Sequence, residues 1–554
     1  MKKAILLSLA IFLLLLVVYF YYQYIINSCS GHFIYGLDDT YIHLSLAKNF
    51  LESGNFGINH EEFGFATSSP LWTVILIIIF KIFGYNELVP FYLNILISIL
   101  IIILSLRIVN KSLDNLPSLF SLIILIILSI PIIPMIFIGM EHLLHLLISL
   151  LFISVTLNLK YEQDKKTKNL IFLAILSILL TLVRYEAIFL IIATSIFMIM
   201  SPIRIKYFLI VAFFAIVPHI IIGFYSISYG GLFFPNPILL KGYEGADSII
   251  SFIQRYVYSG VINLVENSHL LVAFLISIGL LIYIHFQNKN NFLETLSKNN
   301  IESFNENFPF QEKTEYVKDL ILIFLITSIF HLQFAKTGWF YRYEAYLVGI
   351  FLIFLLPFLA KLLIGYTKKT NFFVIAKGRF LFILLSILLI LPFIHRGIES
   401  HNKLRFAPIN IYEQQFHISR FLDKYYKNQP IGMNDIGLVS LSTNVKVIDV
   451  YGLADNNITK AKFDGVYSPE YFYDYLKKKN CNILVIFDAW FKKEIKYNTE
   501  LIRVATWKIE NNEVCGMDEV TFYTLDLQKA ENLKTYLEKY KEIMPKTINL
   551  RILI

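Results

Sequence analysis

Charge is what this sequence has least of. Acidic and basic residues make up 16% of its 554 residues, against about 25% in an ordinary soluble protein, whereas hydrophobic residues make up 56%. Apolar runs such as 88–106 and 119–137 carry no charged residue. Their length matches the roughly 20 residues that a helix needs to cross a bilayer. The sequence therefore predicts a polytopic α-helical protein of the inner or plasma membrane, with about 11 to 13 membrane helices.

Cysteine is also scarce, and the three cysteines show no metal-site spacing. Cys481 and Cys515 could pair if their domain lies in an oxidising compartment, but two free thiols agree equally well with the sequence. There is no phosphate-binding loop and no dinucleotide fingerprint. The net charge of +8 comes mostly from loop lysines, and no basic stripe alternates with aromatic residues. The sequence therefore does not predict nucleic-acid binding.

Basic residues predict which loops face the cytoplasm. The first apolar run is too long for a signal peptide and no cleavage site follows it, so we expect a retained first helix at about 4–26 with a cytoplasmic N-terminus. The basic segments 160–168, 204–206 and 366–379 and the polar loop 288–317 should be cytoplasmic. The remaining loops then face outside: 27–70 (the first outer loop), 138–142, 183–187, 229–265 and 337–344.

The region 71–106 raises a question of parity. Two apolar segments flank "GYNE" at 84–87, and the basic segment 107–111 follows them. Because the expected outer loop 27–70 comes before these segments, the basic segment lies inside only if just one of the two apolar segments spans the membrane fully. A helix of about 13 residues covers only about 20 Å. We therefore favour a first piece, 71–83, that does not fully span, over an outer location for 107–111.

The chain changes character at about residue 397. Charge rises, the long apolar runs end, and short runs of strand-forming residues at 446–453, 482–488 and 519–526 alternate with helical patterns. This alternation predicts a soluble α/β domain over 397–554. The topology places that domain outside the cytoplasm, after a membrane domain of residues 1–396.

The polar residues expected on the outer side indicate a site. Ionisable groups at membrane depth are costly and are kept mainly where they line a site or pair. Five separate outer loops offer carboxylates or cations to the same face. These residues are Asp38, Asp39, His43, Glu141, His142, Arg184, Glu186, Lys241, Arg342 and Glu344.

Each of these residues also has an ordinary structural explanation. Asp38 and Asp39 begin a helix, where aspartate is a favoured N-cap, although one aspartate would satisfy that need. Arg184 and Glu186 could form a local ion pair in a tight hairpin, and Lys241 could be an interfacial lysine. The prediction of a site therefore depends on their joint occurrence on one face.

The chemistry that fits this set is glycosyl transfer. A carboxylate can take the proton of an acceptor hydroxyl, and cations can stabilise a leaving phosphate. Outside the cytoplasm nucleotide-sugars are not available, so a lipid-phosphate sugar would be the donor. The alternatives are a transporter or flippase for a lipid-linked sugar, and a membrane scaffold with a sensor tail. A flippase should carry charges through the middle of its helices, where this sequence has almost none.

The segment "GLDDTYIHLSLAKNFLESGNFGINHEEFGFATSSPLW" at 36–72 resembles the first outer loop of GT-C-fold, polyprenyl-phosphate-sugar-dependent glycosyltransferases. The resemblance is to the bacterial terminal arabinofuranosyltransferases and, more distantly, to the protein mannosyltransferases. Later segments resemble that group's motifs in the same order. They are "GME" at 139–141, "RYE" at 184–186, "YGGLFFPNPILLK" at 229–241, "NDIGLVSL" at 434–441 and "VIDVYGLAD" at 447–455. Tyr185 stands where the group has proline, and "NHEE" at 59–62 replaces N-P-G-E.

This resemblance implies a GT-C-like fold and a hexosyl- or pentosyltransferase that acts on a glycan, lipid or protein acceptor at the bilayer. It implies Asp38 as the general base and Asp39 as its assistant, with a divalent metal on these two aspartates in some members and no other cofactor. Arg184, Lys241 and Arg342 become candidate contacts to the donor phosphate. The residues expected to orient acceptor or cations are His43, Glu141, His142, Glu186, Asn236 and Glu344.

Overall fold

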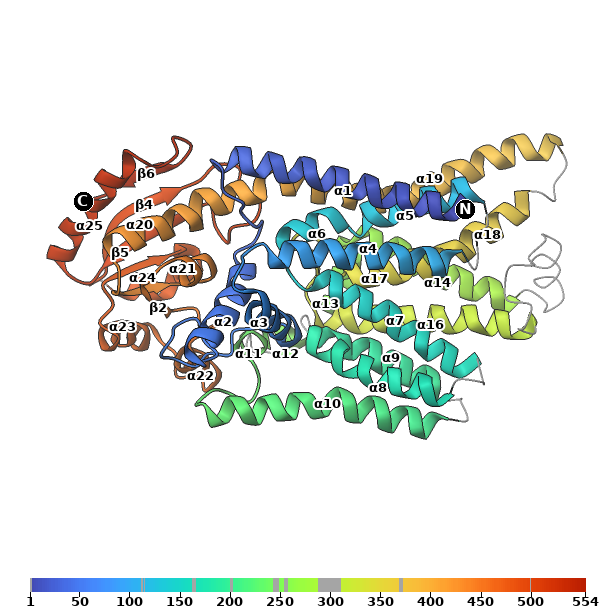
Figure 1. Ribbon diagram of the computed structural model, residues 1–554, viewed down its shortest axis with the longest axis horizontal. Helices are drawn as coiled ribbons and strands as arrows, with labels where there is room; N and C mark the ends of the chain where they lie inside the picture. The colour runs from blue at the N-terminus through green and yellow to red at the C-terminus, as the bar shows by residue number, and fades with distance from the viewer. Residues whose placement is uncertain are drawn as a thin grey trace.

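The computed structural model is a bundle of helices that carries a sheet-containing domain at one end (Figure 1). It describes residues 2–110, 113, 115–161, 166–199, 203–242, 249–253, 258–286, 310–367, 372–498 and 500–554. The expected cytoplasmic loop 288–317 lies largely outside these ranges, and so do parts of the basic segments 160–168 and 366–379.

Within the described residues, seven stretches are long and apolar enough to cross a membrane. Four shorter apolar helices accompany them. The predicted polytopic helical class is confirmed. The long stretches are α1 (Lys2–Ser28), α4 (Val89–Val109), α5 with α6 (Leu116–Ser129 and Ile132–Ile138), α7 (His142–Tyr161), α10 (Arg204–Ser228), α14 (Ser268–Phe286) and most of α16 (Phe310–Phe334). The shorter ones are α3 (Pro70–Phe83), α8 (Lys166–Val183), η2 with α9 (Tyr185–Ala187 and Ile188–Met198), and the run of α17 (Ala345–Ile350), η4 (Phe351–Leu355) and the start of α18 (Leu356–Thr367).

Helix α10 shows why the sequence alone identifies the membrane class. It runs along the edge of the bundle in Figure 1, and it leaves large apolar side chains such as Ile205, Phe208 and Phe224 exposed. A helix that is apolar on its outer face as well as its inner face suits lipid rather than water. The same exposure in a soluble protein would mark an aggregation-prone surface.

The length of helix α3 agrees with a short first piece in the region 71–106, and the side on which 107–111 lies stays a prediction. It has 14 residues, so it extends over only about 21 Å, less than the roughly 30 Å of a hydrocarbon core. Ser69 caps its start by accepting the backbone N–H of Trp72, and Gly84 ends it. In Figure 1 it lies beside α2 (Asp39–Ser53) at the domain end of the bundle.

The bundle and the C-terminal domain are joined by a continuous helix rather than by a linker. Helix α19 spans Phe372–Ile411 and passes the expected domain boundary at 396–397 without a break. The short π-helix η5 (Tyr412–Phe416) and helix α20 (His417–Tyr425) extend it into the domain. The indole N–H of Trp507 on the sheet donates to the backbone oxygen of Glu413 at 3.0 Å, which ties the sheet to this extension.

The domain is built on a six-stranded mixed sheet of order β2-β1-β3-β5-β4-β6. Strands β2, β1 and β3 are parallel, and β5, β4 and β6 continue the sheet in antiparallel fashion. The three expected strand regions contain β2 (Lys446–Asp449), β3 (Ile483–Ile486) and β5 (Glu519–Thr524), whereas β1 (Pro430–Met433), β4 (Ile502–Lys508) and β6 (Asn549–Ile552) were not predicted. The helices of the domain are α21 (Gly437–Ser442), α22 (Asn456–Phe463), α23 (Pro469–Lys478), η6 (Asp488–Trp490), α24 (Lys492–Tyr497) and α25 (Leu527–Lys541).

The first outer loop docks onto the edge of this sheet. The Asn59 side-chain amide donates to the Val447 oxygen at 2.8 Å, and its carbonyl accepts the Val447 N–H at 3.1 Å. Because β2 is an edge strand, this side chain takes the place of a neighbouring strand. Helix α2 lies against α21 in the same contact. The docking brings residues near 38 and residues near 435 together.

Candidate functional site

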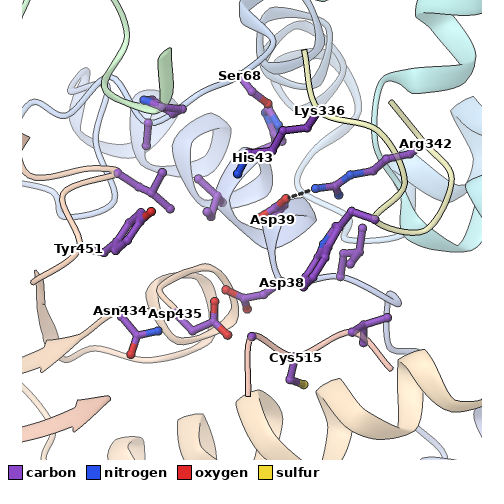
Figure 2. A pocket seen from close by; sticks show the side chains of 18 of the residues that line it. Asp38, Asp39, His43, Ser68, Lys336, Arg342, Asn434, Asp435, Tyr451 and Cys515 are labelled. Atoms are coloured by element: carbon purple, nitrogen blue, oxygen red, sulfur yellow. Dashed lines mark hydrogen bonds and ion pairs between the residues drawn. The ribbon is translucent and has the colours of Figure 1, made fainter. Parts of the chain in front are cut away.

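A cavity of about 420 Å³ lies between loops at one end of the bundle and the C-terminal domain (Figure 2). Its walls include helix α2, the loop before α17, the loops that follow β1, β2 and β3, and the loop between β4 and β5. Its polar and aromatic lining comprises Asp38, Asp39, His43, Ser68, Lys336, Thr337, Trp339, Arg342, Tyr343, Asn434, Asp435, Tyr451, Trp490 and Cys515.

Asp38 is bound to the domain rather than to its own helix. Its carboxylate accepts the backbone N–H of Gly437 at 2.6 Å and that of Leu438 at 2.8 Å, at the first turn of α21. It makes no side-chain cap to α2, so the expectation that it caps the helix it precedes is wrong. Glycine is required at 437, since a Cβ there would lie 2.1 Å from the Asp38 carbonyl oxygen.

Asp39 has the opposite environment, although it is the next residue. Its side chain is 45% exposed and lines the cavity. Its Oδ2 accepts Nη2 of Arg342 at 2.7 Å, the ion pair drawn in Figure 2. The Arg342 guanidinium lies 4.9 Å from the Tyr343 ring centroid, which holds it in place. Asp39 and Arg342 are therefore a carboxylate and a cation that meet at an open cavity.

His43 lies one turn after Asp39, on the same face of α2, as predicted from their spacing. Its Nδ1 is 2.9 Å from Thr73 Oγ1. Its Nε2 is 3.8 Å from Glu141 Oε2. Burial lowers the pKa of His43, and the nearby Glu141 charge offsets this only in part. The ring is therefore held neutral beside the cavity.

Asp435 is a site residue that the sequence analysis did not select. Gln415 donates to its Oδ2 at 2.6 Å, and Figure 2 shows it facing Asp38. Burial raises the pKa of Asp38 to about 6, although the N–H groups of Leu438 and Gly437 oppose the shift. Burial and the neighbouring Asp38 charge raise the pKa of Asp435 well above its ordinary value. The two carboxyls thus titrate as a pair that retains a proton more readily than isolated aspartates.

Lys336 is a second residue that sequence reasoning missed, since the outer stretch was taken to begin at 337. It is exposed and lines the cavity. Three consecutive residues of its loop, Trp339, Phe340 and Tyr341, have positive φ values of 40°, 67° and 56°. Backbone in this region costs about 1–3 kcal/mol per non-glycine residue and persists only where its surroundings impose it.

The buried residues behind this loop supply that constraint. Glu344 accepts the backbone N–H of Gly338 at 3.0 Å and pairs with Arg396 at 3.2 Å. Arg396 in turn donates to the backbone oxygen of Tyr341 at 2.6 Å. Glu344 therefore lies beneath the cavity as an anchor for the loop. It does not line the cavity.

Arg184, Glu141 and Glu186 form a closed ionic group. Arg184 Nη1 lies 2.8 Å from Glu141 Oε1, and its Nη2 and Nε lie 2.7 and 3.1 Å from the two Glu186 oxygens. The arginine is buried, and none of the three lines the cavity. The local ion pair between Arg184 and Glu186 is present. Two carboxylates already neutralise Arg184, and it does not line the cavity. Its contact to a donor phosphate stays a prediction.

Two further predicted residues, His142 and Asn236, lie around the cavity rather than in it. The His142 ring packs 5.8 Å from the Tyr343 ring, centroid to centroid. Asn236 donates to Asn456 Oδ1 at 3.0 Å and so links α11 (Asn236–Gly242) to the domain. Lys241 belongs to α11, but its side chain lies outside the described part of the structure.

The two aspartates do not fit the metal site that the resemblance implied for some members. Both Asp38 oxygens already accept backbone N–H groups, and Asp39 is paired with Arg342. Within the described ranges, no group of three or more His, Cys, Asp or Glu residues is arranged to hold a metal. Cys481 and Cys515 are buried free thiols.

Comparison with known proteins gives a match to one domain model and matches to solved structures. Residues 409–523 match the model of a domain of unknown function (DUF8728), which covers most of the sheet domain. No curated protein matches. Among solved structures, the chain is similar to the crystal structure of ArnT from Cupriavidus metallidurans bound to undecaprenyl phosphate, with a TM-score of 0.47 and 10% sequence identity. The match covers 95% of this chain and 98% of ArnT, and at this TM-score it does not establish a shared fold.

Proposed function

We propose that the protein is a membrane glycosyltransferase of the GT-C type that moves a sugar from a polyprenyl-phosphate donor to an acceptor outside the cytoplasm. The observation that carries this proposal is the composition of the cavity at the end of the bundle. An exposed carboxylate, Asp39, lies there beside two cations, Lys336 and Arg342. Acceptor activation requires a base, and departure of a lipid phosphate requires cations near that base.

We assign the general base to Asp39 in place of Asp38. A base needs access to the hydroxyl proton it removes, and Asp39 has an open path to the cavity. Both Asp38 oxygens are occupied by the N–H groups of α21. Asp38 then acts as a positioning residue that fixes the start of α2, and with it Asp39, against the domain.

The reaction follows from this assignment. Asp39 takes the proton from the acceptor hydroxyl, whose oxygen attacks the anomeric carbon of the donor sugar. The bond from that carbon to the phosphate oxygen breaks, and its electron pair leaves with the polyprenyl phosphate. Lys336 and Arg342 stabilise the charge on that phosphate. Attack from the side opposite the leaving group inverts the anomeric configuration.

The docking of the domain onto the outer loops supports an extracytoplasmic location for both. The first outer loop and the sheet share hydrogen bonds through Asn59, so they must lie on the same side of the membrane. The basic segments predicted to be cytoplasmic, such as 204–206, favour a cytoplasmic location for the other end of the helices. The donor would enter from the bilayer, and the acceptor from the aqueous side.

The test is an assay of the purified full-length protein in lipid nanodiscs with a panel of undecaprenyl- and decaprenyl-phosphate sugars as donors and methyl glycosides as acceptors. The proposal expects release of polyprenyl phosphate, lost in Asp39→Asn and kept in Glu61→Gln, an exposed carboxylate of the same loop. Transport of a lipid-linked sugar across proteoliposomes without its consumption would instead favour a transporter or flippase.

A further inference from the structure

The C-terminal domain contributes two large aromatic side chains to the cavity. Trp490 ends η6, directly after β3, and is 43% exposed. Tyr451 follows β2, and its ring centroid lies 5.2 Å from that of Trp490. Both line the cavity. Exposed aromatic rings that gather in a concave site, rather than singly on a surface, are typical of a binding surface.

Trp490 is held from behind in a fixed position. The Phe487 ring packs edge-on at 5.3 Å between centroids. Gly516 leaves the space that the indole fills, since a Cβ there would lie 2.6 Å from the indole Cζ2. Asp488, at the start of η6, accepts the Tyr523 hydroxyl at 2.9 Å. The indole is therefore rigid before any ligand arrives, which lowers the entropic cost of binding.

The polar groups of the cavity are divided between its two ends. Lys336 and Arg342 lie beside Asp39, whereas Asn434 and Asp435 lie on the domain side, with Tyr451 (Figure 2). A phosphate is repelled by the acidic end and attracted to the cationic end. Asn434 Oδ1 accepts the Phe487 N–H and Asp435 Oδ2 accepts from Gln415, but the Asn434 side-chain NH2 group has no partner among the described residues. A polyprenyl chain would leave that NH2 group unpaired, which is costly.

A sugar ring satisfies both features of the domain side. Its C–H face is apolar and packs flat on an aromatic ring, and its hydroxyls donate to carboxylates and amides at the edge of that ring. We propose that Trp490 and Tyr451 form a subsite for a sugar ring of the acceptor, so that the acceptor is a glycan or a glycosylated molecule. This inference rests on the proposed function, because it places the acceptor opposite the donor phosphate across Asp39.

The test uses binding without donor. The full-length protein in nanodiscs is titrated by calorimetry with a panel of methyl glycosides of hexoses and pentoses and their disaccharides. We expect at least one of these sugars to bind, and Trp490→Ala to weaken it about tenfold, equivalent to about 1.4 kcal/mol. Trp490→Phe, which keeps an aromatic face, should stay within about threefold of the wild type. The matched control is Tyr497→Ala, an exposed aromatic on α24 of the same domain that does not line the cavity.

Three results overturn the subsite. The first is that no sugar of the panel binds the wild type, and the second is that Trp490→Ala binds sugars as the wild type does. The third is that Trp490→Ala weakens the binding of undecaprenyl phosphate and not that of sugars, because Trp490 would then contact the lipid. Consumption of the donor is measured separately on the same preparation. The glycosyltransferase proposal can thus stand if the subsite fails, and the subsite can stand if the transfer reaction fails.

Discussion

Two ionic groups near the domain end of the bundle differ in whether they leave a charged group accessible to a ligand. Arg184 is enclosed by Glu141 and Glu186, and none of the three reaches the cavity. Arg342 pairs with Asp39 at the cavity wall, where Asp39 is 45% exposed. Each group consists of one arginine with one or two carboxylates from loops at this end of the bundle, so the residue types alone do not distinguish them. Both arginines are buried, and it is the exposure of the carboxylate and the ratio of charges that distinguish a structural group from one that can bind and react.

The largest effect on activity should come from a change in the ion pair of Asp39 and Arg342, which faces the cavity. Asp39→Asn keeps the shape of the side chain and removes the base, so we expect kcat to fall about 10²–10⁴-fold. The thermal unfolding temperature should fall moderately, because the asparagine can still accept from Arg342 but no longer neutralises this buried guanidinium. Turnover of a polyprenyl-phosphate sugar in nanodiscs measures the first effect, and scanning fluorimetry measures the second. Activity close to wild type would remove Asp39 from the reaction.

A change in the closed ionic group of Arg184, Glu141 and Glu186 should lower the stability of the protein. Arg184→Met leaves Glu141 and Glu186 without their counter-ion, and breaking a buried pair of this kind costs about 3–5 kcal/mol. We expect a clear fall in unfolding temperature and in yield. The triple variant with Glu141→Gln and Glu186→Gln should recover part of it, because no uncompensated charge remains. If Arg184→Met is as stable as the wild type but fails to bind donor, Arg184 belongs to the site.

Lys336→Ala tests the donor end of the cavity. The side chain is exposed, so stability should be unchanged. The loss of one cation facing the leaving phosphate should lower kcat/KM for the donor about 10–100-fold, and Lys336→Arg should restore most of it. An equal loss in Lys446→Ala, an exposed lysine of the domain outside this cavity, would point to a general charge effect.

The carboxyl pair of Asp38 and Asp435, which lies where the bundle meets the domain, predicts a pH dependence of stability. The pKa of Asp435 is raised well above its ordinary value in the folded chain, and Asp38, Asp39 and Asp449 are the charges that face it. The folded state therefore binds the proton more tightly than the unfolded state, and stability falls as pH rises from about 4 through the raised pKa values. Asp435→Asn resembles the protonated carboxyl, so its unfolding temperature should decline less between pH 6 and 8. An identical decline in both proteins would contradict a raised pKa at Asp435.

The sequence predicts the helical bundle, because apolar runs are a local signal. It also predicts that Asp39 and His43 share a helix face, because the spacing is local as well. It does not reveal the role of Asp38, whose partners Gly437 and Leu438 lie 399 and 400 residues away in the chain. Only tertiary structure shows that an aspartate in a good capping position binds another helix.

The missed residues and strands have similar causes. Lys336 resembles any loop lysine until the folded loop places it at the cavity. Asp435 belongs to the quoted segment 434–441, but nothing local indicates that it faces Asp38. Strand β1 has four residues that include proline and glycine, and β6 also has only four, so neither shows an alternating pattern long enough to recognise.

The most direct test of the account is a cryo-electron microscopy structure of the full-length protein in nanodiscs with undecaprenyl phosphate. The account predicts the phosphate in the cavity between bundle and domain, within hydrogen-bond distance of Lys336 and Arg342, with the Arg184 group unchanged. Phosphate bound at Arg184, with its ion pairs to Glu141 and Glu186 broken, would contradict the account and reverse the roles of the two ionic groups.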